Sequence, residues 1–150
     1  MTMAVTDQEV AVLRAHLARD FEEYERLWPQ LDRGAAARGY TALIAAAFFE
    51  AVDRRFSGQL NKADVVEYVG EVRARFDEQG TEIDPLAAEV MIRAALGDEV
   101  DADLDDETVI STQLFVLTAL VLDEELDGAA LDEFLAEARK TADHWLSQPS

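Results

Sequence analysis

The chain contains no cysteine, only two histidines and two lysines, and few residues of the kinds that break helices. Without cysteine it has no disulfide framework, no thiolate metal site and no cysteine nucleophile. His16 and His144 lie far apart, and neither follows a glutamate by three positions, so the Glu-x-x-His pattern of di-iron bundles is missing. Glycine-rich phosphate loops and serine-nucleophile patterns are missing too. We therefore expect a protein that is not an enzyme.

Positive charge is also scarce, with 13 Lys+Arg against 32 Asp+Glu and a formal net charge of −19. A nucleic-acid-binding protein needs a basic face, and anionic membranes repel a chain this acidic. We therefore expect no nucleic-acid partner and no membrane partner. A protein partner with a basic surface suits this charge, and a second copy of the chain is the other partner we consider.

Long apolar runs are absent as well. The longest uncharged stretch, 108–122, has 15 residues, whereas a membrane span needs about 20 apolar residues. Residues 1–7 lack the basic region and apolar run of a signal peptide, so we expect a cytoplasmic protein. A length of 150 residues and a hydrophobic fraction of 49% fit one globular domain over residues 1–150.

Apolar residues recur at helical spacing, and no segment alternates with period two for long enough to predict a strand. The sequence therefore predicts an all-α fold, a compact six-helix domain. Capping residues, glycines and prolines divide the expected helices as follows: Thr6 to Trp28, about Thr41 to Arg55, Asn61 to Gly80, Asp84 to Gly97, Asp105 or Asp106 to Leu122, and Asp127-Gly128 to Ser147.

Three of these helices have predicted inward faces that the structure can test. The first carries a stripe formed by Leu13, Leu17, Phe21, Tyr24 and Trp28. The fourth carries Leu86, Val90 and Ala94, and the last carries Leu131, Phe134 or Leu135, Ala138, Ala142 and Trp145.

The segment 53–64 has the composition of a loop that binds a divalent cation. Such a loop supplies oxygen ligands at positions 1, 3, 5, 7, 9 and 12 and has glycine at position 6. Here Gly58 takes position 6, and the oxygen-bearing residues at positions 1, 5, 9 and 12 are Asp53, Ser57, Asn61 and Asp64. With an apolar residue at position 8 and an aromatic residue four before the loop, this segment resembles the EF-hand family.

The resemblance has two departures, because Arg55 occupies position 3 and Asp64 replaces the bidentate glutamate at position 12. A second helix-loop-helix lies 44 residues later, where Glu99, Asp101 and Asp105 fall at positions 3, 5 and 9 of the loop. Both anchor positions of that second loop lack a carboxylate. Over about residues 41–123, the resemblance implies a degenerate EF-hand pair with helices on either side, and calcium or magnesium as the cofactor.

Three functions follow as hypotheses. The first is a non-enzymatic acidic helical protein that acts as a protein–protein interaction module. The second is a degenerate EF-hand protein that binds calcium or magnesium through Asp53, Ser57, Asn61 and Asp64. The third is a mimic of nucleic acid, in which carboxylates replace phosphates on the surface of a DNA-binding protein.

Overall fold

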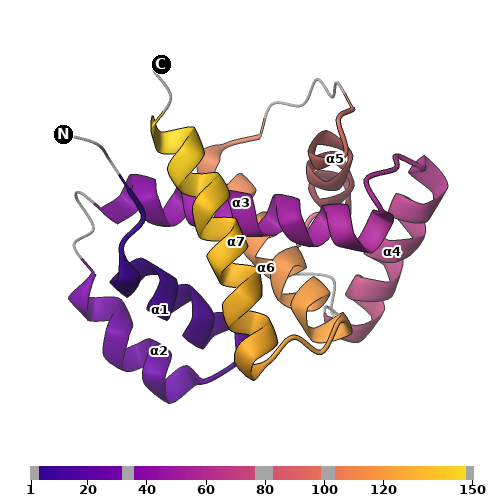
Figure 1. Cartoon of the computed structure of the whole chain (residues 1–150). Helices are drawn as coiled ribbons and strands as arrows, with labels where there is room; N and C mark the ends of the chain where they lie inside the picture. The colour runs from indigo at the N-terminus through magenta and orange to yellow at the C-terminus, as the bar shows by residue number, and fades with distance from the viewer. Residues whose placement is uncertain (1–3, 32–35, 77–82, 99–103, 148–150) are drawn as a thin grey trace. The chain divides into compact units, whose positions relative to one another are not determined.

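The computed structural model describes residues 4–31, 36–76, 83–98 and 104–147 (Figure 1). These residues form seven α-helices and one short 3-10 helix, with no strand among them, which confirms the all-α prediction. The helices are α1 (Asp7–Leu17), α2 (Phe21–Leu27), η1 (Trp28–Gln30), α3 (Ala36–Phe56), α4 (Lys62–Phe76), α5 (Pro85–Ala95), α6 (Asp106–Asp123) and α7 (Gly128–Ser147).

Side-chain caps set the beginnings of four helices where the sequence predicts them. Thr6 and Glu9 form a reciprocal capping box at α1, in which each side chain accepts a hydrogen bond from the other residue's backbone N–H. Asn61, Asp84 and Asp105 accept backbone N–H groups in the first turns of α4, α5 and α6. These contacts satisfy donors that a helix leaves unpaired at its start.

The prediction of six helices is wrong, because the segment from Thr6 to Trp28 is not one helix. The chain leaves α1 through Arg19, whose φ of +59° is left-handed, and the N–H of Asp20 bonds to the carbonyl of Ala15 at 2.9 Å. This bond across five residues closes the end of α1 as a Schellman motif. Asp20 then caps α2 by accepting the N–H of Glu23.

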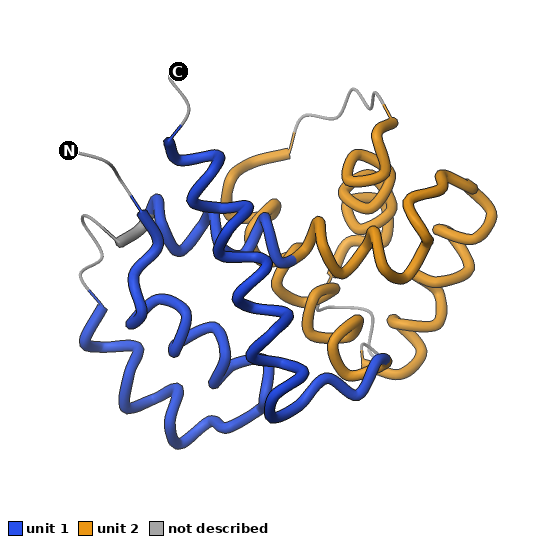
Figure 2. Tube along the Cα trace, viewed as in Figure 1, with its two compact units in different colours: residues 1–47, 124–150 blue, residues 48–123 orange. Residues whose placement is uncertain are grey.

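Contacts group the described chain into two compact units, which Figure 2 shows in different colours. Unit 1 comprises residues 1–47 and 124–150, and unit 2 comprises residues 48–123. The long helix α3 contributes residues to both units. A single domain over 1–150 stays a prediction.

Within unit 1, α1 packs against α2 and α7. Val12 and Leu13 of α1 are fully buried, and so are Leu131 and Leu135 of α7. Within unit 2, α5 packs against both α4 and α6. Val65, Val69 and Val72 of α4, which recur at helical spacing, are all buried.

Four residues from the predicted inward faces are exposed instead, among them Ala94 near the end of α5. Phe21 is 56% exposed, because the chain turns at Arg19 and α2 no longer continues the stripe of α1. Leu86 is 70% exposed, and α5 buries the adjacent face with Ala87, Ala88 and Ile92. Trp145 is 41% exposed near the end of α7. A short helix can have more than one apolar face. Helical periodicity alone therefore does not identify the face that becomes buried.

Candidate functional sites

The predicted cation loop lies between α3 and α4, where helix occupies most of its twelve positions. Asp53 is still within α3, and its carbonyl accepts the N–H of Gly58 at 3.0 Å. Ser57 and Gly58 have left-handed φ values of +53° and +67°, and they reverse the chain after Phe56. The non-helical loop therefore spans only residues 57–61.

The four predicted ligands are exposed, and their described contacts serve the helix ends. Asn61 Oδ1 accepts the N–H groups of Ala63 and Asp64, at 3.0 and 3.3 Å. The Asp53 carboxylate faces Gly58, because a Cβ on that glycine would lie 3.0 Å from its Oδ1. Binding of calcium or magnesium by Asp53, Ser57, Asn61 and Asp64 stays a prediction.

Across the described ranges, the predicted loop included, no group of three or more histidine, aspartate or glutamate side chains has the geometry to hold a metal ion. In the second predicted loop, Glu99 and Asp101 lie outside the described residues. Asp105, its third predicted ligand, caps α6 by accepting the N–H of Thr108 at 2.7 Å. Hydrogen bonding by the side chain of Thr108, and then by its backbone, lowers the pKa of Asp105.

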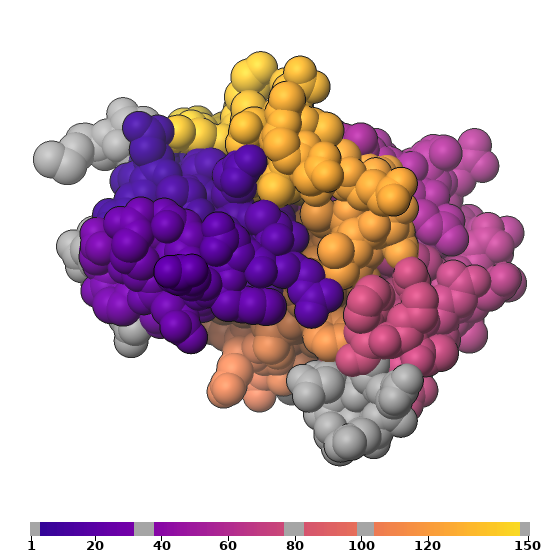
Figure 3. Space-filling model, turned by 90° about the horizontal axis from the view of Figure 1, so that it is seen from below, coloured from indigo at the N-terminus to yellow at the C-terminus, as the bar shows by residue number. Residues whose placement is uncertain are grey.

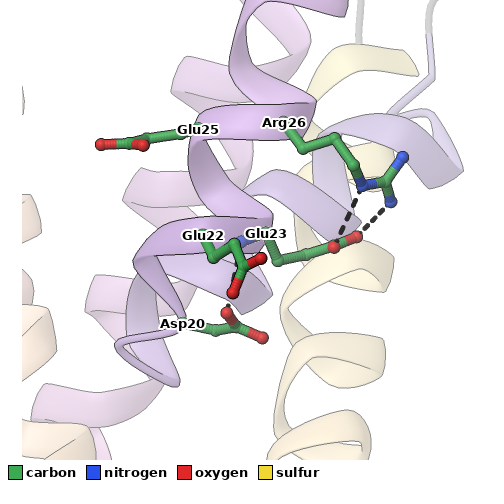
Figure 4. A pocket seen from close by; sticks show the side chains of 5 residues that line it. All are labelled: Asp20, Glu22, Glu23, Glu25 and Arg26. Atoms are coloured by element: carbon green, nitrogen blue, oxygen red, sulfur yellow. Dashed lines mark hydrogen bonds and ion pairs between the residues drawn. The ribbon is translucent and has the colours of Figure 1, made fainter.

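An acidic hollow lies on α2 and is open to solvent, with a volume of about 490 Å³ (Figure 4). Its lining consists of four carboxylates and one guanidinium, from Asp20, Glu22, Glu23, Glu25 and Arg26. All five residues lie on α2 or at its N-cap. In the space-filling view, the violet segment that includes α2 lies on the visible surface (Figure 3).

Only one carboxylate of this acidic hollow is neutralised within it. Arg26 binds both oxygens of Glu23, with 3.1 Å between Nε and Oε2, and this pairing lowers the pKa of Glu23. Asp20 accepts the N–H of Glu23 at 3.2 Å. Within the described chain, Glu22 and Glu25 have no positively charged partner. The hollow therefore presents net negative charge to solvent.

A chain of aromatic rings holds the inner side of α2. The His16 ring contacts the edge of Tyr24 at 5.4 Å between centroids, and Tyr24 stacks on Trp28 at 5.8 Å. Trp28 in turn contacts Tyr40 of α3 at 5.9 Å. Burial lowers the pKa of His16, because the charged imidazolium loses hydration there, and burial raises the pKa of Tyr40.

A second polar cluster joins the ends of α4 and α6 in unit 2. Tyr68 is only 1% exposed, and its hydroxyl donates to Asp123 Oδ2 at 3.0 Å. Arg75 binds both oxygens of Asp123, at 2.5 and 3.0 Å. The guanidinium of Arg55 lies 4.9 Å from the centre of the Tyr68 ring. With every member engaged, this cluster stabilises the helix ends.

Glu9 of α1 is a buried carboxylate in unit 1, only 1% exposed. Its Oε1 accepts the N–H of Thr6 at 2.8 Å, whereas no donor in the described chain reaches Oε2. The carboxylate lies directly against Gly39 of α3, where a Cβ would come within 2.6 Å of Oε2. Gly39 precedes the expected start of the second helix at about Thr41, whereas in the structure it lies within the first turns of α3.

Sequence reasoning missed the acidic hollow, the Tyr68 cluster and the Glu9–Gly39 contact. The run Asp20 to Arg26 holds four acids, and this was the one available signal for the acidic hollow. The Tyr68 cluster joins residues 55 positions apart, and no local pattern announces such a pair. Helical spacing would pair Arg75 with Glu71, four residues before it, whereas its described ion pair is with Asp123.

Comparison with known proteins finds no matching family model, no matching curated protein and no matching solved structure. None of the described helices has the length and apolar character needed to cross a membrane. The described residues thus define an all-α protein with an acidic hollow on one short surface helix.

Proposed function

We propose that this chain is a non-enzymatic interaction module that binds a protein with a basic surface through α2. The observation that supports this most directly is the acidic hollow, where Glu22 and Glu25 face solvent without a described cation. Carboxylates arranged in this way steer a cationic partner to the surface and select against acidic ones. A mimic of nucleic acid is one form of this proposal, since DNA-binding proteins present basic faces.

Phe21 gives this surface an apolar contact next to its charges. It begins α2 between Asp20 and Glu22, and 56% of it is exposed. An exposed aromatic side chain surrounded by charges is a common anchor in protein interfaces, because its burial excludes water and strengthens the surrounding ion pairs. We therefore expect the partner to offer both lysine or arginine side chains and an apolar patch.

The test is the binding of a lysine- and arginine-rich amphipathic peptide, measured by fluorescence anisotropy. The double variant Glu22→Gln/Glu25→Gln should bind about three- to tenfold more weakly, since exposed charge pairs contribute roughly 0.2–1 kcal/mol each. Binding to the wild-type chain should also weaken between about 50 and about 300 mM NaCl, because salt screens exposed charges.

A matched control separates this surface from net charge. Glu67→Gln/Glu71→Gln removes the same two charges from exposed positions on α4, and it should leave peptide binding unchanged within about twofold. Phe21→Ala should weaken binding, whereas Leu86→Ala, at another exposed apolar position, should not. Equal losses for both charge-removing variants would show that the acidic hollow is not the binding surface.

Binding of a divalent cation is the second proposal, and the place of Asp53 beside the Gly58 turn favours it. Calcium that binds only the folded state raises the melting temperature, and the rise grows with the logarithm of the calcium concentration once that concentration exceeds the Kd. We expect this rise in the wild-type chain and its loss in Asp53→Ala, measured by thermal unfolding with millimolar calcium or magnesium. Sodium at equal ionic strength controls for general screening of the −19 charge.

Two outcomes would contradict the cation proposal. One is an equal rise in melting temperature with sodium at the same ionic strength, and the other is an unchanged calcium response in Asp53→Ala. Asp132→Ala serves as the matched control, because it removes one exposed carboxylate from α7 in the other unit.

A further inference from the structure

We propose that α2 is a flap of unit 1 that opens when His16 takes up a proton. The flap is the segment 18–30, which contains α2 and η1 and follows the end of α1. Its opening is a property of the chain alone, independent of any partner.

The most deeply buried residues around the flap lie just outside its two ends. Leu17 before it is 1% exposed and Leu31 after it is 8% exposed, but none of the residues 18–30 is buried. The flap covers Tyr24, Leu27 and Trp28 only in part, whereas α1 and α7 each bury five residues, so its local opening requires less free energy than unfolding of either helix.

A hinge stands where the flap leaves α1. Arg19 has a φ of +59°, a left-handed conformation that a residue with a side chain adopts at a cost of roughly 1 kcal/mol or more. Opening allows this residue to relax. The turn that closes α1 consists of two backbone bonds, from the N–H of Arg19 to His16 and from that of Asp20 to Ala15.

The contacts that hold the flap closed include the chain of rings that begins at His16. Tyr24 and Trp28, both on the flap, lie between His16 of α1 and Tyr40 of α3. A hydrogen bond of 3.1 Å from the Gln8 side chain to the Gln30 carbonyl adds a polar contact. His16 is the first ring in this series of contacts. A charge on its imidazole therefore changes the free energy of the closed state directly.

Most charged residues of the flap and of the last turn of α1 already have partners, and on the flap Glu22 and Glu25 are the exceptions. On the flap, Asp20 accepts the N–H of Glu23, and the Glu23 carboxylate binds Arg26. On α1, Arg14 binds Asp132 of α7 at 2.6 Å. The ring that faces the imidazole belongs to Tyr24, and tyrosine does not ionise in the acid range.

The direction of the effect follows from linkage. Burial lowers the pKa of His16 in the closed state, whereas an open flap leaves the imidazole in water with an ordinary pKa near 6.5. Below that pH the proton binds the open state preferentially, so the opening constant rises as the pH falls from about 6.5 towards the lower closed-state pKa, and it levels off below that pKa. Each pKa unit of difference multiplies the open population by about ten.

The experiment measures hydrogen exchange of the full chain between about pH 7.5 and about pH 5, corrected for intrinsic exchange rates. Amides of the flap should lose protection on acidification, while those of α1 and α7 keep theirs. The emission of Trp28, followed in a Trp145→Phe background, should shift to the red with the same midpoint, below pH 6.5. The variant His16→Phe keeps a ring against Tyr24 and cannot be protonated, so both changes should vanish.

The controls make each outcome decisive. His144→Phe removes the chain's other histidine, and it should leave the acid transition as in the wild type. If His16→Phe does not fold, His16→Gln tests the same point. The proposal fails if flap amides do not change with pH, if the transition survives the loss of His16, or if α1 loses protection together with the flap. Any effect of acid on partner binding rests on the proposed function, whereas these measurements need no partner.

Discussion

Replacing Asp123 with alanine should lower the free energy of unfolding by about 2–3 kcal/mol. The substitution leaves the buried Tyr68 hydroxyl without its acceptor and removes the bidentate partner of Arg75. The unpaired hydroxyl accounts for the larger part of the loss, because Arg75 is 45% exposed and water screens its charge. Urea denaturation followed by circular dichroism measures the change.

Two further variants divide this effect between the partners of Asp123. Tyr68→Phe removes only the hydroxyl and should cost about 1 kcal/mol. Asp132→Ala breaks the ion pair with Arg14, in which Asp132 is 60% exposed, and should change stability by no more than about 0.5 kcal/mol. If Asp132→Ala lowered the free energy of unfolding as much as Asp123→Ala, the greater burial around Asp123 would not be the reason for its larger expected effect.

The same aspartate gives stability a dependence on pH. Burial alone would raise the pKa of Asp123, but hydrogen bonds from Arg75 and Tyr68 outweigh it and hold the pKa below the usual 3.8. The stability from ionised Asp123 is therefore complete above pH 3.8 and lost as the pH falls through the lower folded-state pKa. The free energies of unfolding of the wild type and of Asp123→Asn should therefore approach each other as the pH falls through this pKa. Urea denaturation at a series of acidic pH values measures both.

The helix ends were predictable from sequence because local chemistry sets them. Asn61, Asp84 and Asp105 have side chains that accept backbone N–H groups within three residues, so their role needs no tertiary contact. The break at Arg19 was not predictable in this way. A left-handed residue at that position is usually glycine, and the stretch from Leu17 to Phe21 contains neither glycine nor proline, so it gives the pattern of an uninterrupted helix.

The candidate sites were less predictable than the helices, because tertiary contacts build them. Spacing drew attention to Asp53 and Asp64, yet spacing alone does not report that α3 continues through Phe56 and leaves a loop of five residues. Conversely, Glu9 was recognised only as a capping residue. Its burial against Gly39 depends on how α3 packs within unit 1, and a periodic pattern contains no information on that contact.

Gly39→Ala should destabilise the chain by about 2 kcal/mol, although alanine favours a helix over glycine by about 1 kcal/mol. The new Cβ would lie 2.6 and 2.8 Å from the oxygens of the buried Glu9 carboxylate. Glu9 must then move, and the hydrogen bond from the Thr6 N–H to Oε1 is lost or lengthened. Gly70→Ala is the matched control, because this α4 glycine has nothing within 4 Å of an added Cβ, and the change should stabilise by up to about 1 kcal/mol.

A double-mutant cycle with Glu9→Ala shows whether the Glu9 carboxylate is the cause. In that background the side chain that blocks the added methyl group is gone, so Gly39→Ala should reverse sign and stabilise the chain by about 1 kcal/mol. The coupling energy between the two positions is then about 3 kcal/mol, at the upper end for residues in direct contact. If Gly39→Ala destabilised both backgrounds equally, its effect would come from the α3 backbone and not from Glu9. A reversal of sign would show that Gly39 is needed because it leaves room for a buried carboxylate.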